Sequence, residues 1–577
     1  MRRRTLLQSA LLSPLALTSA PRTFAQDAPA SAKPLGPMPM CIGLNGVNDW
    51  SPEQPFLDVM KTARTWIGHK PGQWGGAGHT DLAQADYLDA HGWPLAIPPE
   101  LSSIGTVVLN DLPEEAASLK GRYVLRFEGD GIVEVSGRSQ NVRYGRNEVS
   151  FDFTPGEGAV VIRIQRTDRS KTGDHVRNIT IVREEHLRAF DAGATFNPDF
   201  LRVLDGFKAV RFMDWMLTNE TPQTSWDSRP QASDYTYGLR GVPAEVMLDL
   251  ANRIGVDAWF NIPHTADDDF VQQFATLARD TLWHDLRCHV EFSNEVWNWQ
   301  FPQARWADEM ARKRWGKDNA WVQYYALRAA EVARICAGVF EATGMRDRLI
   351  NVISSQTGWL GLEADIFEPP LLAQEQQPDA PSIASAFDAY AITGYFGAPL
   401  GMEDRAPLIR QWLSDSHDLA EGAAAAKRLR GEDRDAYLAA HRYDAATALA
   451  AAELRDGLAS GEAEGSLNWL IETVFPYQAE IAKKWGLDLV MYEGGTHVVG
   501  IGPMVDAEDL TDFFIHLNYT PEMGMLYTEL INGWAKTGGK LFNVFSDVNK
   551  PSKWGSWGAL RYLSDSNPRW DAIRAFL

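Results

Sequence analysis

Residues 257–295 read DAWFNIPHTADDDFVQQFATLARDTLWHDLRCHVEFSNE, and two strand-like runs in this stretch flank a helix-like segment. The runs 257–263 and 288–295 are short, apolar and rich in aromatic residues, as is typical of buried strands. Between them, 268–283 carries apolar residues at helical spacing behind a group of aspartates, which favour a helix N-terminus. Strand, helix and strand in this order predict a βαβ unit with parallel strands.

The same alternation continues in both directions along the chain. Upstream, a strand near Met40 precedes a helix-like stretch, and a second strand precedes another helix at 243–255. Downstream, a long helix is expected over 302–343, and further helical stretches lie between the later strands. Besides the one near Met40, the expected strands are 208–215, 257–263, 288–295, 349–356, 387–395, 487–495 and 540–546. Eight alternating strands predict an α/β fold, a (β/α)8 TIM barrel, in preference to an open doubly wound sheet.

Two segments interrupt this alternation. Between about 106 and 182 the chain shows short strand-like runs with turn residues every eight to twelve positions, which predicts a small β-sandwich over 105–185. An Ala- and Glu-rich block at 403–465 predicts a helical insertion before the seventh barrel strand. The barrel is therefore expected to occupy 38–104 and 186–577.

The first 25 residues are typical of an export signal. Arg2, Arg3 and Arg4 precede a short apolar run, and small residues follow up to possible cleavage sites after Ala20 or Ala25. The segment RRRTLLQ resembles a twin-arginine signal, and an ordinary secretory signal is the alternative. Either interpretation predicts a periplasmic or secreted bacterial protein, with residues 26–37 as a linker. No later run of about 18 apolar residues suggests a membrane span.

Composition narrows the classes of partner. Among 577 residues, 45% are hydrophobic and 23% charged, as expected of a folded chain with a large core. The formal net charge of -21 disfavours nucleic acids and anionic membranes as partners. The 21 tryptophans offer faces that can stack on sugar rings. Cys41, Cys288 and Cys336 lack metal-ligand spacing, and we expect neither a metal nor a cofactor.

Polar residues at strand ends are the candidate site, because the active sites of such barrels form where the carboxyl ends of the strands meet. Asn294 and Glu295 lie at the exit of the fourth expected strand, and Glu493 lies at the exit of the seventh, before two glycines. Two carboxyl groups about 5 to 5.5 Å apart are what a retaining glycosidase requires. An isolated Asn-Glu pair is common by chance, so the evidence is the joint pattern at several strand ends.

These residues resemble clan A of the glycoside hydrolases, whose members carry an Asn-Glu pair after strand four and a glutamate after strand seven. The resemblance implies that Glu295 is the general acid/base, that Glu493 is the nucleophile, and that Asn294 holds a sugar 2-hydroxyl. It matches Arg211 to the arginine of strand two that binds the nucleophile, and Tyr395 to the tyrosine of strand six.

The resemblance also implies further sugar contacts. Trp554 or Trp557 in PSKWGSWG matches the sugar platform after strand eight, and His264 is expected to be a wall residue after strand three. The chain departs from the clan because no His-x-Tyr signature precedes Tyr395 and because an insertion separates the first two strands. No family within the clan can be assigned.

The chemistry requires two carboxyl groups with different pKa values. An arginine beside Glu493 is expected to lower its pKa, whereas apolar surroundings at Val296, Trp297 and Trp299 are expected to keep Glu295 protonated. The sequence contains no Gly-x-Ser-x-Gly, His-Glu-x-x-His or phosphate-binding glycine motif that would indicate other chemistry.

The function predicted is an exported retaining glycoside hydrolase that cleaves β-linked oligo- or polysaccharides without a cofactor or metal. A non-catalytic carbohydrate-binding protein on the same barrel and a transglycosylase with the same residues are the alternatives. Sugar identity, linkage, endo or exo action and oligomeric state stay open.

Overall fold

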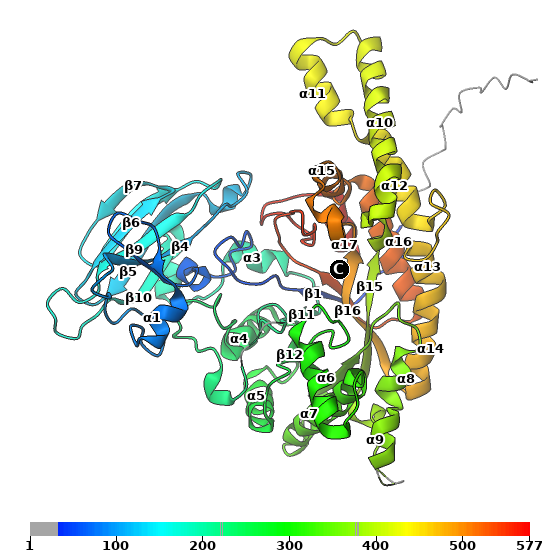
Figure 1. The fold of residues 1–577 in the computed structure, drawn as a ribbon, viewed down its shortest axis with the longest axis horizontal. Coiled ribbons are helices and arrows are strands. Elements are labelled where there is room, and N and C mark those ends of the chain that lie inside the picture. Colours follow the sequence, from blue (N-terminus) through cyan, green and yellow to red (C-terminus); the bar gives the residue numbers. More distant parts are fainter. Residues whose placement is uncertain (1–32, 220, 222, 376, 378–379) are drawn as a thin grey trace, which may run out of the picture.

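A closed barrel of eight parallel strands forms the centre of the computed structural model, which describes residues 33–219, 221, 223–375, 377 and 380–577 (Figure 1). Its strands are β1 (Met40–Gly43), β11 (Ala209–Arg211), β12 (Asp257–Ile262), β13 (Cys288–Phe292), β14 (Leu349–Ser354), β15 (Ala389–Phe396), β16 (Asp488–Thr496) and β17 (Phe542–Phe545). Each corresponds to one of the eight strands expected, so the predicted TIM barrel is confirmed.

The barrel closes through the short first strand, β1. Its residue Cys41 pairs with Ala209 of β11, and its residue Met40 pairs with Phe542 of β17. All of these pairings are parallel, so the carboxyl ends of the eight strands surround one mouth. Polar residues that follow different strands are therefore brought together there.

Helices surround the barrel and bury their apolar faces against it. They are α3 (Pro198–Val203), α4 (Ala244–Ile254), α5 (Asp268–Thr281), α6 (Pro302–Trp315), α7 (Trp321–Glu341), α8 (Leu362–Phe367), α9 (Pro370–Glu375), α13 (Leu467–Trp469), α14 (Phe475–Trp485), α15 (Glu508–Leu517), α16 (Pro521–Thr537) and α17 (Pro568–Arg574). The short helix α2 (Leu187–Asp191) precedes them and buries none of its residues. In α5, for example, Asp267 caps the N-terminus by accepting from the Phe270 amide at 2.7 Å. The aspartates before this helix therefore serve as helix-start residues.

The single helix expected over 302–343 is two helices, α6 and α7. Gly316 follows α6 with φ of +65°, a left-handed conformation that glycine adopts at little cost and that commonly ends helices. The break matters for the site because α7 then begins at Trp321, close to the barrel mouth.

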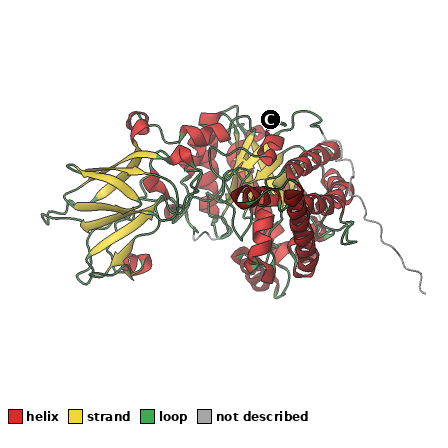
Figure 2. Ribbon diagram, turned by 90° about the horizontal axis from the view of Figure 1, so that it is seen from above, coloured by secondary structure: helices red, strands yellow, loops and turns green. Residues whose placement is uncertain are grey.

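Between β1 and β11 the chain forms nine strands in two antiparallel sheets (Figure 2). One sheet has the order β3-β2-β4-β9-β6 and the other β10-β5-β8-β7. Their bounds are β2 (Ile67–His69), β3 (Gly76–Ala77), β4 (Ser103–Val108), β5 (Gly121–Glu128), β6 (Ile132–Gly137), β7 (Ser139–Tyr144), β8 (Glu148–Phe153), β9 (Val160–Arg166) and β10 (Arg177–Arg183), and the short helix α1 (His79–Gln84) lies between β3 and β4. Figure 1 shows this unit beside the barrel.

The sheets begin earlier than the boundary expected at residue 105. Strand β2 pairs with β4 through Ile67 and Gly105, so residues from 67 onward belong to the sheet unit. Strands of two or three glycine-containing residues show no alternation of apolar and polar side chains, which explains why the sequence did not indicate them. The longer β8 does alternate, with Val149, Phe151 and Phe153 buried.

The helical block before β16 consists of α10 (Ala406–Ala426), α11 (Gly431–His441) and α12 (Asp444–Asp456). Figure 1 shows α10 and α11 projecting from the barrel, and α11 buries none of its residues. The loop after α12 returns to the barrel mouth and contributes Glu462, Glu464 and Gly465 to the main cavity there.

Within the described part of the chain, no helix is both long and apolar enough to cross a membrane. The three cysteines are buried free thiols. The expected signal peptide, together with most of the expected linker, lies outside the described residues.

Candidate active site

The barrel mouth holds a cavity of about 1440 Å³. Its walls come from residues at the carboxyl ends of β11, β13, β14, β15, β16 and β17, together with the loop from the helical insertion. Both candidate glutamates, Glu295 and Glu493, line it, as do Asn294, Tyr395 and Trp557. Residues that are far apart in the sequence therefore share one space because the strands are parallel and the barrel is closed.

Arg211 is the central cation beneath this cavity. Its side chain is 1% exposed. Nη1 donates to Glu493 Oε1 at 2.9 Å, and Nη2 donates to Glu291 Oε2 at 3.0 Å and to Asn294 Oδ1 at 2.9 Å. One guanidinium group therefore fixes side chains of β16 and of β13 with the turn after it, a task suited to its planar array of donors.

Glu291 was not among the residues expected in the site. It is fully buried, and besides Arg211 its carboxylate accepts from Trp259 Nε1 at 3.0 Å, Asn261 Nδ2 at 2.8 Å and Ser354 Oγ at 2.8 Å. A glutamate inside the apolar strand CHVEF is the signal that could have revealed it, because a carboxyl group in such a strand needs buried hydrogen-bond partners. It lies behind the cavity wall and holds Arg211 in place.

Glu295 lies in a strained turn directly after β13. Ser293 and Glu295 have φ of +60° and +40°, values that non-glycine residues rarely adopt and that often occur at functional sites. The carboxylate accepts from Tyr492 Oη at 2.9 Å and from Asn298 Nδ2 at 2.9 Å. The turn and these two donors direct Glu295 into the cavity.

Glu493 is held from two sides. The bond from Arg211 is the contact that was expected, and Glu493 also accepts from Tyr395 Oη at 3.0 Å. It is only 5% exposed, and burial raises its pKa from 4.5 to about 8; Arg211 opposes this shift, and the negative charge of Glu295 adds to it.

The pKa of Glu493 therefore differs from the expectation. Arg211 acts in the direction predicted, but it shares its single charge between Glu493 and the fully buried Glu291. Desolvation of Glu493 is the largest influence on its pKa and outweighs the opposing charge of Arg211. The free site consequently retains a proton on this carboxyl at neutral pH.

Asn294 is fixed at the cavity wall. Its Oδ1 accepts from Arg211, and its Nδ2 donates to Asn219 Oδ1 at 3.2 Å. Asn219 also accepts from Gln303 Nε2 at 2.7 Å. Asn219 and Gln303 were not expected, since neither follows a recognisable strand in the sequence.

The structure separates the two tryptophans that were considered together. Trp557 lines the cavity and meets the rings of Tyr395, His497 and Phe545 at centroid distances of 6.0, 5.1 and 5.8 Å. Trp554 is 65% exposed and does not line the cavity; its backbone oxygen accepts from Trp557 Nε1 at 2.9 Å. Trp557 is therefore the better placed residue for contact with a sugar ring.

His264 does not lie where a wall residue was expected. It is 6% exposed, it packs edge-on against Trp306 at 5.5 Å, and it is not among the cavity-lining residues. Burial lowers its pKa to about 4. A histidine at the end of an apolar strand can equally be a packed core residue, and this placement favours that interpretation.

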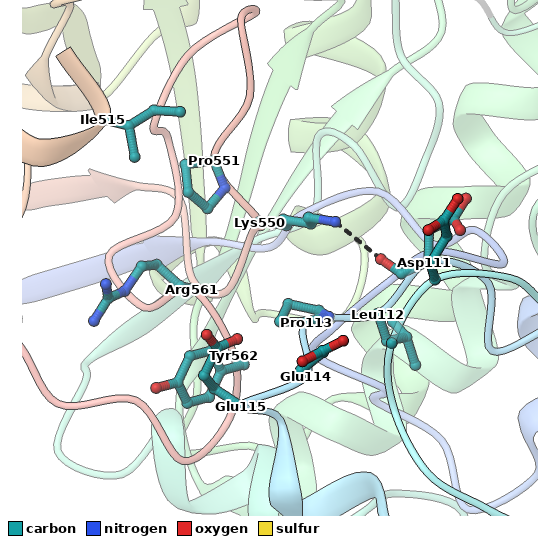
Figure 3. A pocket seen from close by; sticks show the side chains of 12 residues that line it. Asp111, Leu112, Pro113, Glu114, Glu115, Ile515, Lys550, Pro551, Arg561 and Tyr562 are labelled. Carbon is teal, nitrogen blue, oxygen red and sulfur yellow. Dashed lines mark hydrogen bonds between the residues drawn. The ribbon is translucent and has the colours of Figure 1, made fainter. Parts of the chain in front are cut away.

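A second cavity of about 700 Å³ lies between the sheet unit and the loop after β17 (Figure 3). Asp111, Glu114 and Glu115 of the sheet unit line it together with Lys550 and Tyr562 of that loop, and Lys550 Nζ donates to the Asp111 carbonyl oxygen at 3.1 Å. Neither Glu295 nor Glu493 lines this cavity. The loop after β17 lines this second cavity and also carries Trp557, which lines the main cavity. This loop therefore lies between the sheet unit and one wall of the main cavity.

No protein-family model and no curated protein sequence matches the chain. Solved structures that are similar to it include a fungal β-1,4-galactanase (TM-score 0.33, 10% identity, covering 66% of this chain and 91% of that chain). A 4-O-α-L-rhamnosyl-β-D-glucuronidase from Fusarium oxysporum 12S has a TM-score of 0.33 and 13% identity over 65% of this chain and 62% of that chain. The catalytic domain of the β-amylase from Paenibacillus polymyxa has a TM-score of 0.26 and 8% identity over 60% of this chain and 87% of that chain. The fold assignment rests on the closed strand order of the barrel itself.

Proposed function

We propose that this protein is a glycoside hydrolase that cleaves β-linked saccharides with retention of configuration. The observation that carries the proposal is that Glu295 and Glu493 line one cavity at the barrel mouth, with Arg211 joining Glu493 to Asn294 beneath it. Two carboxyl groups in a shared cavity are the machinery of a double displacement at a sugar carbon.

The two glutamates take different roles because their contacts differ. Glu493, oriented by Arg211 and Tyr395, attacks the anomeric carbon and forms a glycosyl-enzyme ester. Glu295, held by Tyr492 and Asn298, donates its proton to the departing oxygen and then takes a proton from the water that cleaves the ester.

This mechanism needs one proton on the pair. The pKa of about 8 for Glu493 means that the free site keeps that proton up to mildly alkaline pH. The productive arrangement places the proton on Glu295 and leaves Glu493 ionised beside Arg211. The same site could also transfer the glycosyl group to a sugar hydroxyl instead of water. Product analysis measures the ratio of hydrolysis to transfer.

The proposal is tested with alanine variants on an activated aryl β-glycoside in the presence of azide. Glu493→Ala should give an inverted glycosyl azide, because azide enters from the vacated nucleophile face. Glu295→Ala should slow substrates with poor leaving groups by about 10²–10⁴-fold and give a retained azide. Glu508→Gln, at the exposed start of α15, is the control for loss of a carboxylate.

Wild-type rates in both alanine variants would refute catalysis by these glutamates. Retained affinity for sugars in that case would favour the alternative of a carbohydrate-binding protein. We also propose export through the twin-arginine route, which is supported by the segment RRRTLLQ.

A further inference from the structure

Beyond Glu295, two tryptophans in the wall of the main cavity and a third that packs behind them form a cluster, here called the tryptophan shelf: Trp299, Trp359 and Trp321. Trp299 and Trp359 line the cavity and are 44% and 51% exposed. Trp321, the first residue of α7, supports both of them, with ring centroids 5.1 Å from Trp299 and 6.4 Å from Trp359. The shelf thus combines segments that follow β13 and β14.

The exposure of these rings indicates a ligand. An indole face left in water forgoes the stabilisation that burial would give, and contiguous exposed aromatic surface commonly marks a binding site. Single exposed tryptophans such as Trp283 need no such explanation. Trp299 and Trp359 differ from it because they share a cavity with the two glutamates.

The charge of the cavity restricts the ligand. Its ionisable carboxylic side chains are Asp214, Glu295, Glu462, Glu464 and Glu493, whereas none of the described residues that line it is lysine or arginine. His497 also lines the cavity, and burial lowers its pKa, which disfavours a positive charge there. Two of these carboxylates have an arginine partner behind the wall, Glu493 with Arg211 and Glu462 with Arg405, but neither arginine lines the cavity. A ligand that bears carboxylate or sulfate groups would therefore meet acidic side chains without a free cation at the cavity surface. Uncharged sugar rings, with apolar faces that stack on indole, fit this surface.

The tryptophan shelf lies on the Glu295 side of the bond that is cleaved. Trp299 follows Glu295 on the same loop, and the intervening Asn298 donates to the Glu295 carboxylate at 2.9 Å. A general acid stands beside the leaving group. Tyr395 and Trp557, by contrast, gather around Glu493, where the sugar that becomes attached to the enzyme must lie.

We propose that the tryptophan shelf binds the leaving-group side of an uncharged β-linked glycan, so that the protein acts within or at the end of an extended chain. This inference rests on the proposed function of the two glutamates. It assigns Trp299 and Trp359 as specificity-determining residues that bind sugar rings and take no part in bond cleavage.

The test compares two substrate types in Trp299→Ala and Trp359→Ala. For uncharged β-linked oligosaccharides of increasing length, kcat/KM should fall roughly tenfold in each variant, mainly through KM, with the largest loss on the longest substrates. For glycosyl fluorides, whose leaving group is a single ion, kcat/KM should stay unchanged. Trp283→Ala, an exposed tryptophan outside the cavity, is the matched control and should change neither.

An equal loss on fluorides and oligosaccharides would overturn the inference, since it would indicate damage to the catalytic pair. No loss on either substrate would also overturn it and would leave the proposed glycosidase intact. A preference for carboxylated or sulfated glycans would overturn the assignment of an uncharged ligand. If no glycan were cleaved at all, calorimetric titration with an uncharged oligosaccharide would decide: binding that is lost in Trp299→Ala supports the shelf, and unaltered binding refutes it.

Discussion

Replacement of Glu493 by glutamine is expected to stabilise the folded protein, and to do so more strongly as pH rises. The carboxyl has a pKa of about 8 in the folded chain, compared with 4.5 as its ordinary value. A raised pKa means that folding favours the protonated form. The stability that Glu493 contributes is therefore fully present below about pH 4.5 and is lost as pH rises through about 8.

The size of the effect follows from the same two pKa values. At about 1.4 kcal/mol per pKa unit, the difference between 4.5 and about 8 limits the total loss to about 5 kcal/mol. Between about pH 5.5 and about pH 7.5, the wild-type protein should lose about 2.5 kcal/mol through this group. Glutamine does not titrate, so the variant should lack this contribution.

The assay is urea denaturation of both proteins at several pH values, with the difference in unfolding free energy plotted against pH. Tyr395→Phe is the matched control, because it removes the hydroxyl that donates to Glu493 but keeps the titrating carboxyl. Its pH dependence should stay close to that of the wild type. A stability difference between Glu493→Gln and wild type that is flat over this range would show that Arg211 keeps Glu493 ionised, contrary to the reasoning above.

Three further predictions concern charge. Arg211→Met leaves Glu291 buried without its cation and should cost about 3–5 kcal/mol in urea denaturation; a loss below about 1 kcal/mol would argue against the ion-pair network. For substrates with poor leaving groups, kcat/KM should fall about tenfold per pH unit above about pH 8. Above this pH the two glutamates lose the one proton that they share, and no acid is left to protonate the departing oxygen. A pH-rate profile that stays level to about pH 10 would contradict this. Joint replacement of Arg3 and Arg4 by lysine should leave the precursor in the cytoplasm on cell fractionation, and unchanged export would rule out the twin-arginine route.

The barrel and the positions of its main site residues could be predicted from the sequence because they depend on periodicity. Apolar runs of strand length alternate with helical spacing, and eight such units favour a closed parallel barrel over an open doubly wound sheet. Residues at or near the carboxyl ends of these strands, among them Arg211, Glu295, Tyr395 and Glu493, are then brought together at one end of the barrel by the topology alone. The long stretches of sequence between these residues do not prevent them from meeting at the barrel mouth.

The features of the site that depend on side-chain conformation and on desolvation were determined only by the tertiary structure. Whether Trp554 or Trp557 faces the cavity depends on the path of one loop, and the burial of His264 depends on its packing against Trp306. The sequence determined that an arginine would lie near Glu493, but not that Glu291 would compete for the same guanidinium group. The pKa of Glu493 is raised chiefly by exclusion of water, against the opposing charge of Arg211 and with the negative charge of Glu295 adding to the shift, and these surroundings exist only in the folded chain.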